Sequence, residues 1–129
     1  MKKILALLVT ALAAASTFAA SPFADISVDD VNKLATSKSA VIIDVNGTDS
    51  YKAGHVPGAL NYEAIEGKLA ATLPKDKNTP IVAYCANPQC GAYARAATAA
   101  QKLGYTNIKH MAAGIAGWKA AGMKTEHGS

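Results

Sequence analysis

The chain has 129 residues, half of them hydrophobic, and a formal net charge of +4 at pH 7. Two of its 13 basic side chains stand at the N-terminus, and the other lysines are scattered along the sequence. Scattered charge excludes the concentrated basic patch of a nucleic-acid-binding protein. The length indicates one domain with a single core.

The first 20 residues have the features of a secretory signal peptide. Lys2 and Lys3 precede an apolar stretch over residues 4–15, and Thr17-Phe18-Ala19 offers small side chains where a signal peptidase reads. The apolar stretch is shorter than the roughly 20 residues that cross a bilayer. We therefore expect residues 1–20 to be cleaved and the chain to be periplasmic or secreted, with no stable membrane insertion afterwards. An uncleaved anchor is the alternative.

The rest of the chain alternates between helix and strand patterns, with short apolar runs for strands and helical spacing of apolar residues for helices. Ser27 and Thr48 are predicted N-caps, and Gly54, Gly104 and Gly122 are predicted helix ends. In chain order, the predicted elements are helix 28–35, strand 41–45, helix 48–53, strand 59–61, helix 62–71, strand 81–84, helix 92–103, strand 107–111 and helix 114–121.

This alternation predicts an α/β fold with a mainly parallel sheet. In such sheets, ligands bind outside the carboxyl ends of the strands. Asp44 and Cys85 both fall at such ends, so we expect them to share one mouth.

Cys85 is the candidate nucleophile. It follows a predicted strand and precedes a loop that opens a helix, so unpaired backbone N–H groups and the positive end of the helix dipole should favour its thiolate. The loop is rich in turn-forming residues and is expected to fold around the sulfur. It consists of Ala86, Asn87, Pro88, Gln89, Cys90 and Gly91.

The two cysteines allow other interpretations. In an exported protein, Cys85 and Cys90 could form a structural disulfide, although a bridge over so small a ring would stabilise the fold only modestly. A metal site is disfavoured because no histidine lies near the pair in sequence. Nothing else in the sequence indicates a metal or an organic cofactor.

Four stretches together resemble a single-domain rhodanese-like protein. They cover nearly all of the chain after the signal peptide, in the order that the family has. The stretches are Ile42-Ile43-Asp44-Val45, Gly54-His55-Val56-Pro57-Gly58-Ala59, Val82-Ala83-Tyr84-Cys85 and Ala113-Gly114-Ile115-Ala116-Gly117-Trp118.

The resemblance implies a five-stranded parallel sheet with helices on both faces, and sulfur transfer through a persulfide. Cys85 would take the outer sulfur of a donor such as thiosulfate or polysulfide and pass it to a thiol or to cyanide. Backbone N–H groups of residues 86–91 would hold the terminal sulfur anion, as an oxyanion hole holds oxygen.

The chain departs from the family pattern in three places. Asn46 replaces the arginine that usually follows Asp-Val, the loop after Cys85 lacks the usual charge, and Cys85 lies about two residues further from the Gly-Tyr helix end. This longer Cys-x4-Cys form resembles a subgroup of small rhodanese-like proteins, so thiosulfate as the natural donor does not follow.

Three further residues are assigned supporting roles. Asp44 is expected to fix the loop by accepting backbone N–H bonds, and His55 to hold the turn before the next strand. Arg95 is expected to face solvent or pair with an aspartate, and drawing an anionic donor toward Cys85 is its alternative role. The domain is expected over residues 26–123, followed by a mobile tail over 124–129.

Two other functions remain open. A thiol redox protein would carry a persulfide or a sulfenate on Cys85, and Cys90 would resolve it as an internal disulfide. A non-catalytic rhodanese-like binding module would use neither cysteine. The oligomeric state is not predicted from the sequence.

Overall fold

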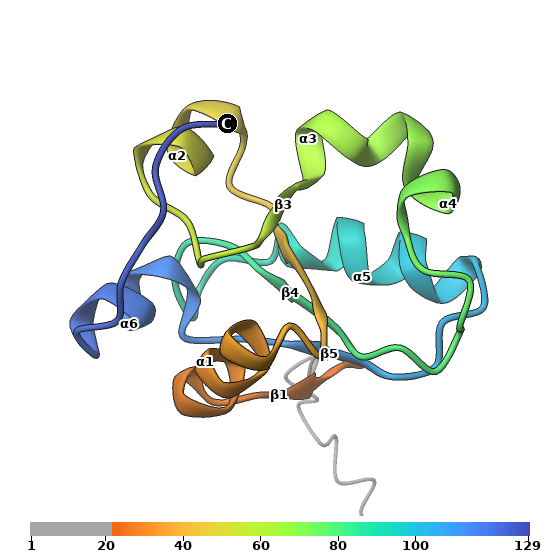
Figure 1. Ribbon diagram of the computed structural model, residues 1–129, viewed down its shortest axis with the longest axis horizontal. Helices are drawn as coiled ribbons and strands as arrows, with labels where there is room; N and C mark the ends of the chain where they lie inside the picture. The colour runs from red at the N-terminus through yellow and green to blue at the C-terminus, as the bar shows by residue number, and fades with distance from the viewer. Residues whose placement is uncertain (1–21) are drawn as a thin grey trace, which may run out of the picture.

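The computed structural model describes residues 22–129, so the predicted signal peptide lies outside the described residues. Five strands form one sheet in the order β1-β5-β4-β2-β3, and every neighbouring pair runs parallel. The strands are β1 (Ala24–Asp25), β2 (Val41–Asp44), β3 (Leu60–Asn61), β4 (Ile81–Tyr84) and β5 (Ile108–His110). The α/β fold with a five-stranded parallel sheet is therefore confirmed (Figure 1).

Helices follow the strands in the predicted alternation. They are α1 (Val28–Ser37), α2 (Thr48–Ala53), α3 (Tyr62–Ile65), the 3-10 turn η1 (Glu66–Lys68), α4 (Leu69–Thr72), α5 (Tyr93–Lys102) and α6 (Gly114–Ala120). The helix predicted over 62–71 is thus three short pieces. Within residues 22–129, no helix has the length and apolar character needed to span a membrane.

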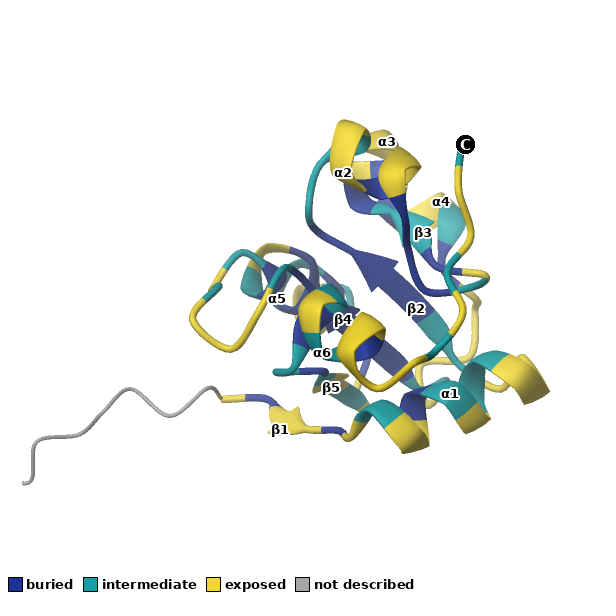
Figure 2. Cartoon of the chain, turned by 90° about the vertical axis from the view of Figure 1, so that its left-hand side faces the viewer, coloured by how far each residue is buried: buried dark blue, intermediate teal, exposed yellow. Residues whose placement is uncertain are grey.

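Strand β4 is buried on both faces of the sheet, which explains its continuous apolar sequence. Ile81 and Ala83 pack into one apolar cluster with side chains of α3, α4 and α5. Val82 and Tyr84 pack into the other, with side chains of α1, α2 and α6. Figure 2 shows the buried strands between helices whose outer faces are exposed.

The predicted caps have mixed outcomes. Ser27 caps α1 as expected, because its Oγ accepts the N–H of Asp30 at 3.1 Å. Thr48 is instead the first residue of α2, after Gly47. Its N–H and its hydroxyl both donate to Oε2 of Glu63, at 2.6 and 2.8 Å. A carboxylate from α3 therefore accepts the hydrogen bonds of the first residue of α2. The sequence around α2 does not encode this contact.

Strand β1 is missing from the predicted elements. It has two exposed residues, which pair with Lys109 and His110 of β5. A strand this short has no periodicity to detect, and its partner lies more than 80 residues away in sequence. The pairing is extended by the N–H of Ile26, which donates to the carbonyl of His110 at 2.9 Å.

The C-terminal segment, whose mobility stays a prediction, makes hydrogen bonds to the domain. Glu126 and His55 exchange two backbone hydrogen bonds of 2.9 Å, and the N–H of Gly128 donates to the carbonyl of Lys52 at 2.9 Å. The indole N–H of Trp118 donates to the carbonyl of Lys124 at 2.8 Å. The end of the chain lies beside α2 (Figure 1).

Candidate active site around Cys85

Cys85 directly follows β4, at the carboxyl edge of the sheet. Its side chain lies on the same face as Ala83 and is 3% exposed. The start of α6 holds the backbone here, because Ile115 donates its N–H to the carbonyl of Cys85 at 3.0 Å. Ala116 likewise donates to the carbonyl of Ala86 at 2.9 Å. The point where the chain leaves the central strand is therefore fixed.

Gly114 permits this close approach. Its φ is +64°, and a Cβ placed there would lie 2.5 Å from the carbonyl carbon of Ala86. A side chain at this position would push the Cys85 loop away from α6. The sequence offered one signal for this role, the glycine inside the Ala113-Gly114-Ile115 stretch, but it did not reveal the contact partner.

Cys85 and Cys90 form a disulfide, with their Cα atoms 6.3 Å apart. The turn between them explains the pairing: Asn87 accepts the N–H of Gln89 on its side-chain oxygen at 3.0 Å and the N–H of Cys90 on its carbonyl at 3.1 Å. This turn returns residue 90 to residue 85. The bridge that the sequence left open is thus the state observed.

The loop in this bridged form differs from the predicted arrangement of N–H groups around the sulfur. The N–H groups of Gln89 and Cys90 donate to Asn87 instead of the sulfur. Sγ of Cys85 lies 3.3 Å from the carbonyl oxygen of Cys90. A carbonyl oxygen can accept a hydrogen bond from a thiol, whereas it repels a thiolate. The persulfide-holding role of residues 86–91 stays a prediction for the reduced protein.

The bridge presents its two sulfurs unequally. Cys90 is partly exposed while Cys85 is buried, and Asn87, Pro88 and Gln89 between them are exposed. A reagent from solvent therefore meets the loop and Cys90 first.

Asp44 lies at the same sheet edge but on the opposite face from Cys85. Its carboxylate is fully buried, accepting the hydroxyl of Tyr84 at 2.7 Å and the N–H of Asn46 at 2.8 Å. The Tyr84 oxygen in turn accepts the N–H of Val56 at 3.0 Å. Burial, followed by the charge of Asp44, raises the pKa of Tyr84 above its ordinary value, so the phenol stays protonated. Asp44 and the sulfur do not share one mouth.

His55 is buried in the turn between α2 and β3. Its ring stacks on Tyr51 with centroids 3.7 Å apart, and its Nδ1 lies 2.7 Å from the carbonyl oxygen of Tyr51. The Tyr51 hydroxyl donates to the carbonyl of Ala59 at 2.6 Å. These contacts hold the turn, and they lie in the apolar cluster on the face opposite Cys85.

A cavity of about 340 Å³ opens at the carboxyl edge on the Cys85 face. It is lined by Val45, Asn46, Gly47, Tyr62, Glu63, Glu66 and Arg95. Neither Cys85 nor its loop lines this cavity. Val45, which does, donates its N–H to the carbonyl of Tyr84 at 2.9 Å and belongs to the same apolar cluster as Cys85.

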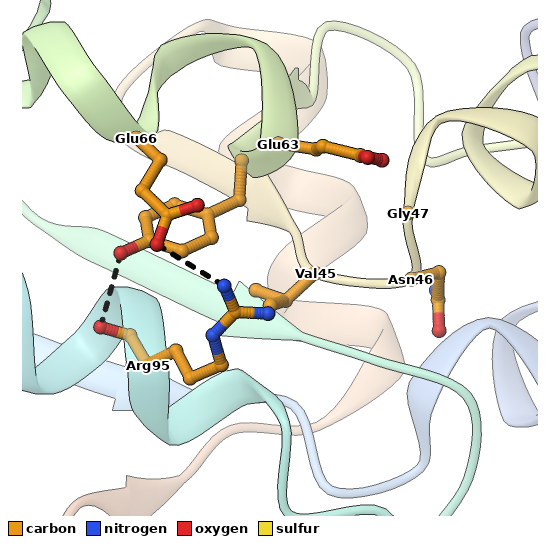
Figure 3. Close-up of a pocket in the computed structure, with 7 residues that line it drawn as sticks. Val45, Asn46, Gly47, Glu63, Glu66 and Arg95 are labelled. Atoms are coloured by element: carbon orange, nitrogen blue, oxygen red, sulfur yellow. Dashed lines mark hydrogen bonds and ion pairs between the residues drawn. The ribbon is translucent and has the colours of Figure 1, made fainter.

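The charge in this cavity is mainly negative. Arg95 reaches Glu66 with Nη2 3.1 Å from Oε1, so its expected partner is a glutamate rather than an aspartate (Figure 3). Hydrogen bonds from Thr48 hold the pKa of Glu63 below its usual value. With Asn46 in place of an arginine, the side chains lining the cavity leave no unpaired cation for an anionic donor.

His110 is a residue of this edge that carries little functional signal in the sequence. It pairs with Ala83 in the sheet, so it lies on the Cys85 face, and it stacks on Tyr93 with ring centroids 3.9 Å apart. The alternation of Ile108 and His110 within the strand could have placed it. No group of three or more His, Cys, Asp or Glu side chains in residues 22–129 is arranged to hold a metal ion.

The family model for the rhodanese-like domain matches residues 27–121 of the chain. The chain is 29% identical over 101 residues to the thiosulfate sulfurtransferase GlpE of Pseudoalteromonas translucida, covering 77% of this chain and 91% of that protein. It is 33% identical over 89 residues to the HTH-type transcriptional regulator Rv0324 of Mycobacterium tuberculosis. That match covers 68% of this chain but only 38% of the regulator.

Among solved structures, the chain resembles the BH2092 protein from Bacillus halodurans with a TM-score of 0.70. The two are 23% identical, and the alignment covers 81% of this chain and 77% of the other. This likeness supports the fold. The regulator contains a segment similar to this chain within a longer protein that is named for transcriptional regulation.

Proposed function

We propose that this chain, which belongs to the rhodanese-like domain family, is a sulfurtransferase or sulfur carrier acting through Cys85. The observation that carries the proposal is the position of Cys85, fixed between the central strand and a loop that leads into α5. A thiosulfate sulfurtransferase among its relatives supports the same chemistry.

The reaction begins with the thiolate of Cys85, which attacks the outer sulfur of the donor. The bond between the donor's two sulfurs breaks and Cys85 holds a persulfide; with thiosulfate, the leaving group is sulfite. A thiolate or cyanide then attacks the terminal sulfur and restores the Cys85 thiolate. No general base is needed, which agrees with a site whose one buried carboxylate, Asp44, faces the other side of the sheet.

The reduced protein is the reactive form, because a sulfur in a disulfide has no thiolate to attack with. Reduction of the bridge would free the loop, and the N–H groups of residues 86–91 could then turn toward the sulfur. The bridge also supports our proposal that the chain is exported, since disulfides persist in oxidising compartments.

The cavity at the same edge of the sheet as Cys85 supports a donor other than thiosulfate. Arg95 is paired with Glu66, and Glu63 adds a second negative charge. The doubly charged thiosulfate meets repulsion there, so we expect it to bind weakly and singly charged organic persulfides to react faster.

The test uses the Cys90→Ser variant, which cannot form the bridge. Given polysulfide and excess cyanide, it should form thiocyanate over many turnovers, and the Cys85→Ser/Cys90→Ser double variant should lose at least 100-fold of that rate. Equal rates in the two variants would overturn the proposed function.

A thiol redox protein is the second candidate, and the Cys85–Cys90 bond is the observation that favours it. Such a protein would exchange electrons with partner thiols without any sulfur donor. Reduction of a model disulfide by the dithiol form, at a rate independent of polysulfide, would favour this candidate.

A further inference from the structure

We propose that Cys90 resolves the persulfide on Cys85 and releases its outer sulfur as sulfide, leaving the bridge observed in the structure. This inference rests on the proposed function, because it needs a persulfide on Cys85. It adds a product, sulfide, and a partner, a dithiol reductant.

Cys90 could attack either sulfur of the persulfide, and the observed bond matches one of the two attacks. A thiolate can attack the outer sulfur of a persulfide and carry it away, or attack the inner sulfur and expel sulfide. Only attack on the inner sulfur, which is Sγ of Cys85, produces a bond between the two Sγ atoms. That bond is the one present, so the loop can reach the geometry of the inner attack.

The loop keeps the two residues within reach. The turn at Asn87 draws residue 90 back toward Cys85, and the Cα atoms lie 6.3 Å apart. At the other end, Ile115 and Ala116 hold the carbonyls of Cys85 and Ala86. An internal thiol positioned in this way competes strongly with any acceptor that must diffuse in.

The step balances without an outside oxidant. Cys90 loses its proton and forms the bond to Sγ of Cys85, the Cys85–sulfur bond breaks, and the outer sulfur leaves with the electron pair as HS⁻. The sulfane sulfur gains two electrons, which come from the two thiols as they become a disulfide. Each sulfur atom taken from the donor therefore converts one protein chain from the dithiol to the disulfide form.

Return to the dithiol form requires two electrons from an external dithiol. Its first thiolate would attack Cys90, because Cys90 is partly exposed whereas Cys85 is 3% exposed. Cys85 then leaves as thiolate, and the second thiol of the partner displaces Cys90 from the mixed disulfide. The exposed residues Asn87, Pro88 and Gln89 are the surface that this partner would contact.

The experiment is a single turnover without cyanide. The protein without its predicted signal peptide is reduced, freed of reductant and mixed with one equivalent of an organic persulfide. Three quantities are then measured: released sulfide, free thiols and intact mass. The wild-type protein should release one sulfide per chain, lose both thiols and gain no sulfur. Cys90→Ser should retain one added sulfur and release none. Gln101→Ser, an exposed substitution on α5, should match the wild type.

The outcomes separate the two proposals. If the wild-type protein keeps the added sulfur on Cys85 and the free thiol of Cys90, the role of Cys90 is overturned and the proposed function stands. A Cys90→Ser variant that gains no sulfur would instead overturn the proposed function itself. Sulfide release from Cys90→Ser at the wild-type rate would show that another thiol resolves the persulfide and would also overturn the inference.

Discussion

Tyr84 joins three parts of the chain through one hydroxyl group. It donates to Asp44 at the end of β2 and accepts from Val56 in the turn before β3, while its own backbone leads directly into Cys85. The alternation of β4 points Tyr84 and Cys85 to opposite faces. Tyr84 therefore fixes the backbone position of Cys85, although its side chain does not contact the sulfur.

The variant Tyr84→Phe should lower the free energy of unfolding by about 1–3 kcal/mol, because it leaves a buried carboxylate and a buried N–H without their shared partner. Denaturant unfolding measures the loss. Tyr105→Phe is the matched control, since its hydroxyl donates to the backbone carbonyl of Pro74, and a loss of about 1 kcal/mol is expected there. An equal or smaller loss in Tyr84→Phe would contradict the linking role.

The raised pKa of Tyr84 also predicts a pH dependence. Above about pH 10 the unfolded tyrosine ionises while the folded one keeps its proton, so stability present below pH 10 is lost as pH rises. Unfolding measured between neutral and strongly alkaline pH should show this decline, and it should be shallower in Tyr84→Phe. Some decline remains in the variant, because burial also raises the pKa of Tyr51 and Tyr62. Equal slopes would contradict the assignment.

The junction between the Cys85 loop and α6 is the contact between elements on which the site depends. Gly114 adopts φ +64° against Ala86, whereas Gly122, at the end of the same helix, adopts φ +76° with open space around it. The two glycines thus separate the cost of backbone strain from the cost of a steric clash.

Gly122→Ala should cost about 1–2 kcal/mol, the penalty for a Cβ in the left-handed region. Gly114→Ala should cost a further ~1–3 kcal/mol for overpacking, and it should slow sulfur uptake by Cys85 because the loop must move. Thermal unfolding and persulfide formation, measured on both variants, check this. Similar results for the two glycines would show that the contact with Ala86 is unimportant.

Sequence reasoning predicted the elements that have their own periodicity or caps. The run at β4 and the Ser27 cap needed only neighbouring residues, and both are confirmed. The strand β1 and the contact of Glu63 with Thr48 depend on partners far along the chain, so no local pattern could show them. The choice between thiol and disulfide at Cys85 was open for another reason: the spacing to Cys90 permits both, and the turn at Asn87 decides.

For the molecule as a whole, sulfur transfer by Cys85 requires that the dithiol form stays folded. The bridge closes a ring of only a few residues, while the sheet and its two apolar clusters are formed by segments from Phe23 to Trp118. Reduction should therefore lower the free energy of unfolding by about 2 kcal/mol, the loop-entropy value for so small a ring.

Denaturant unfolding of the oxidised protein, the reduced protein and Cys90→Ser measures this effect. The reduced protein and the variant should agree with each other and both should unfold cooperatively. A reduced protein without a cooperative transition would mean that the bridge is structural, and the proposed catalytic cycle would then have no folded starting state.

Peptide mass mapping can show whether Cys85 itself accepts the sulfur. Reduced Cys90→Ser is treated with polysulfide, trapped with an alkylating reagent and digested. We predict one extra sulfur atom on the peptide that contains Cys85. An alkylated Cys85 peptide without added sulfur, from a folded and fully reduced protein, would contradict it.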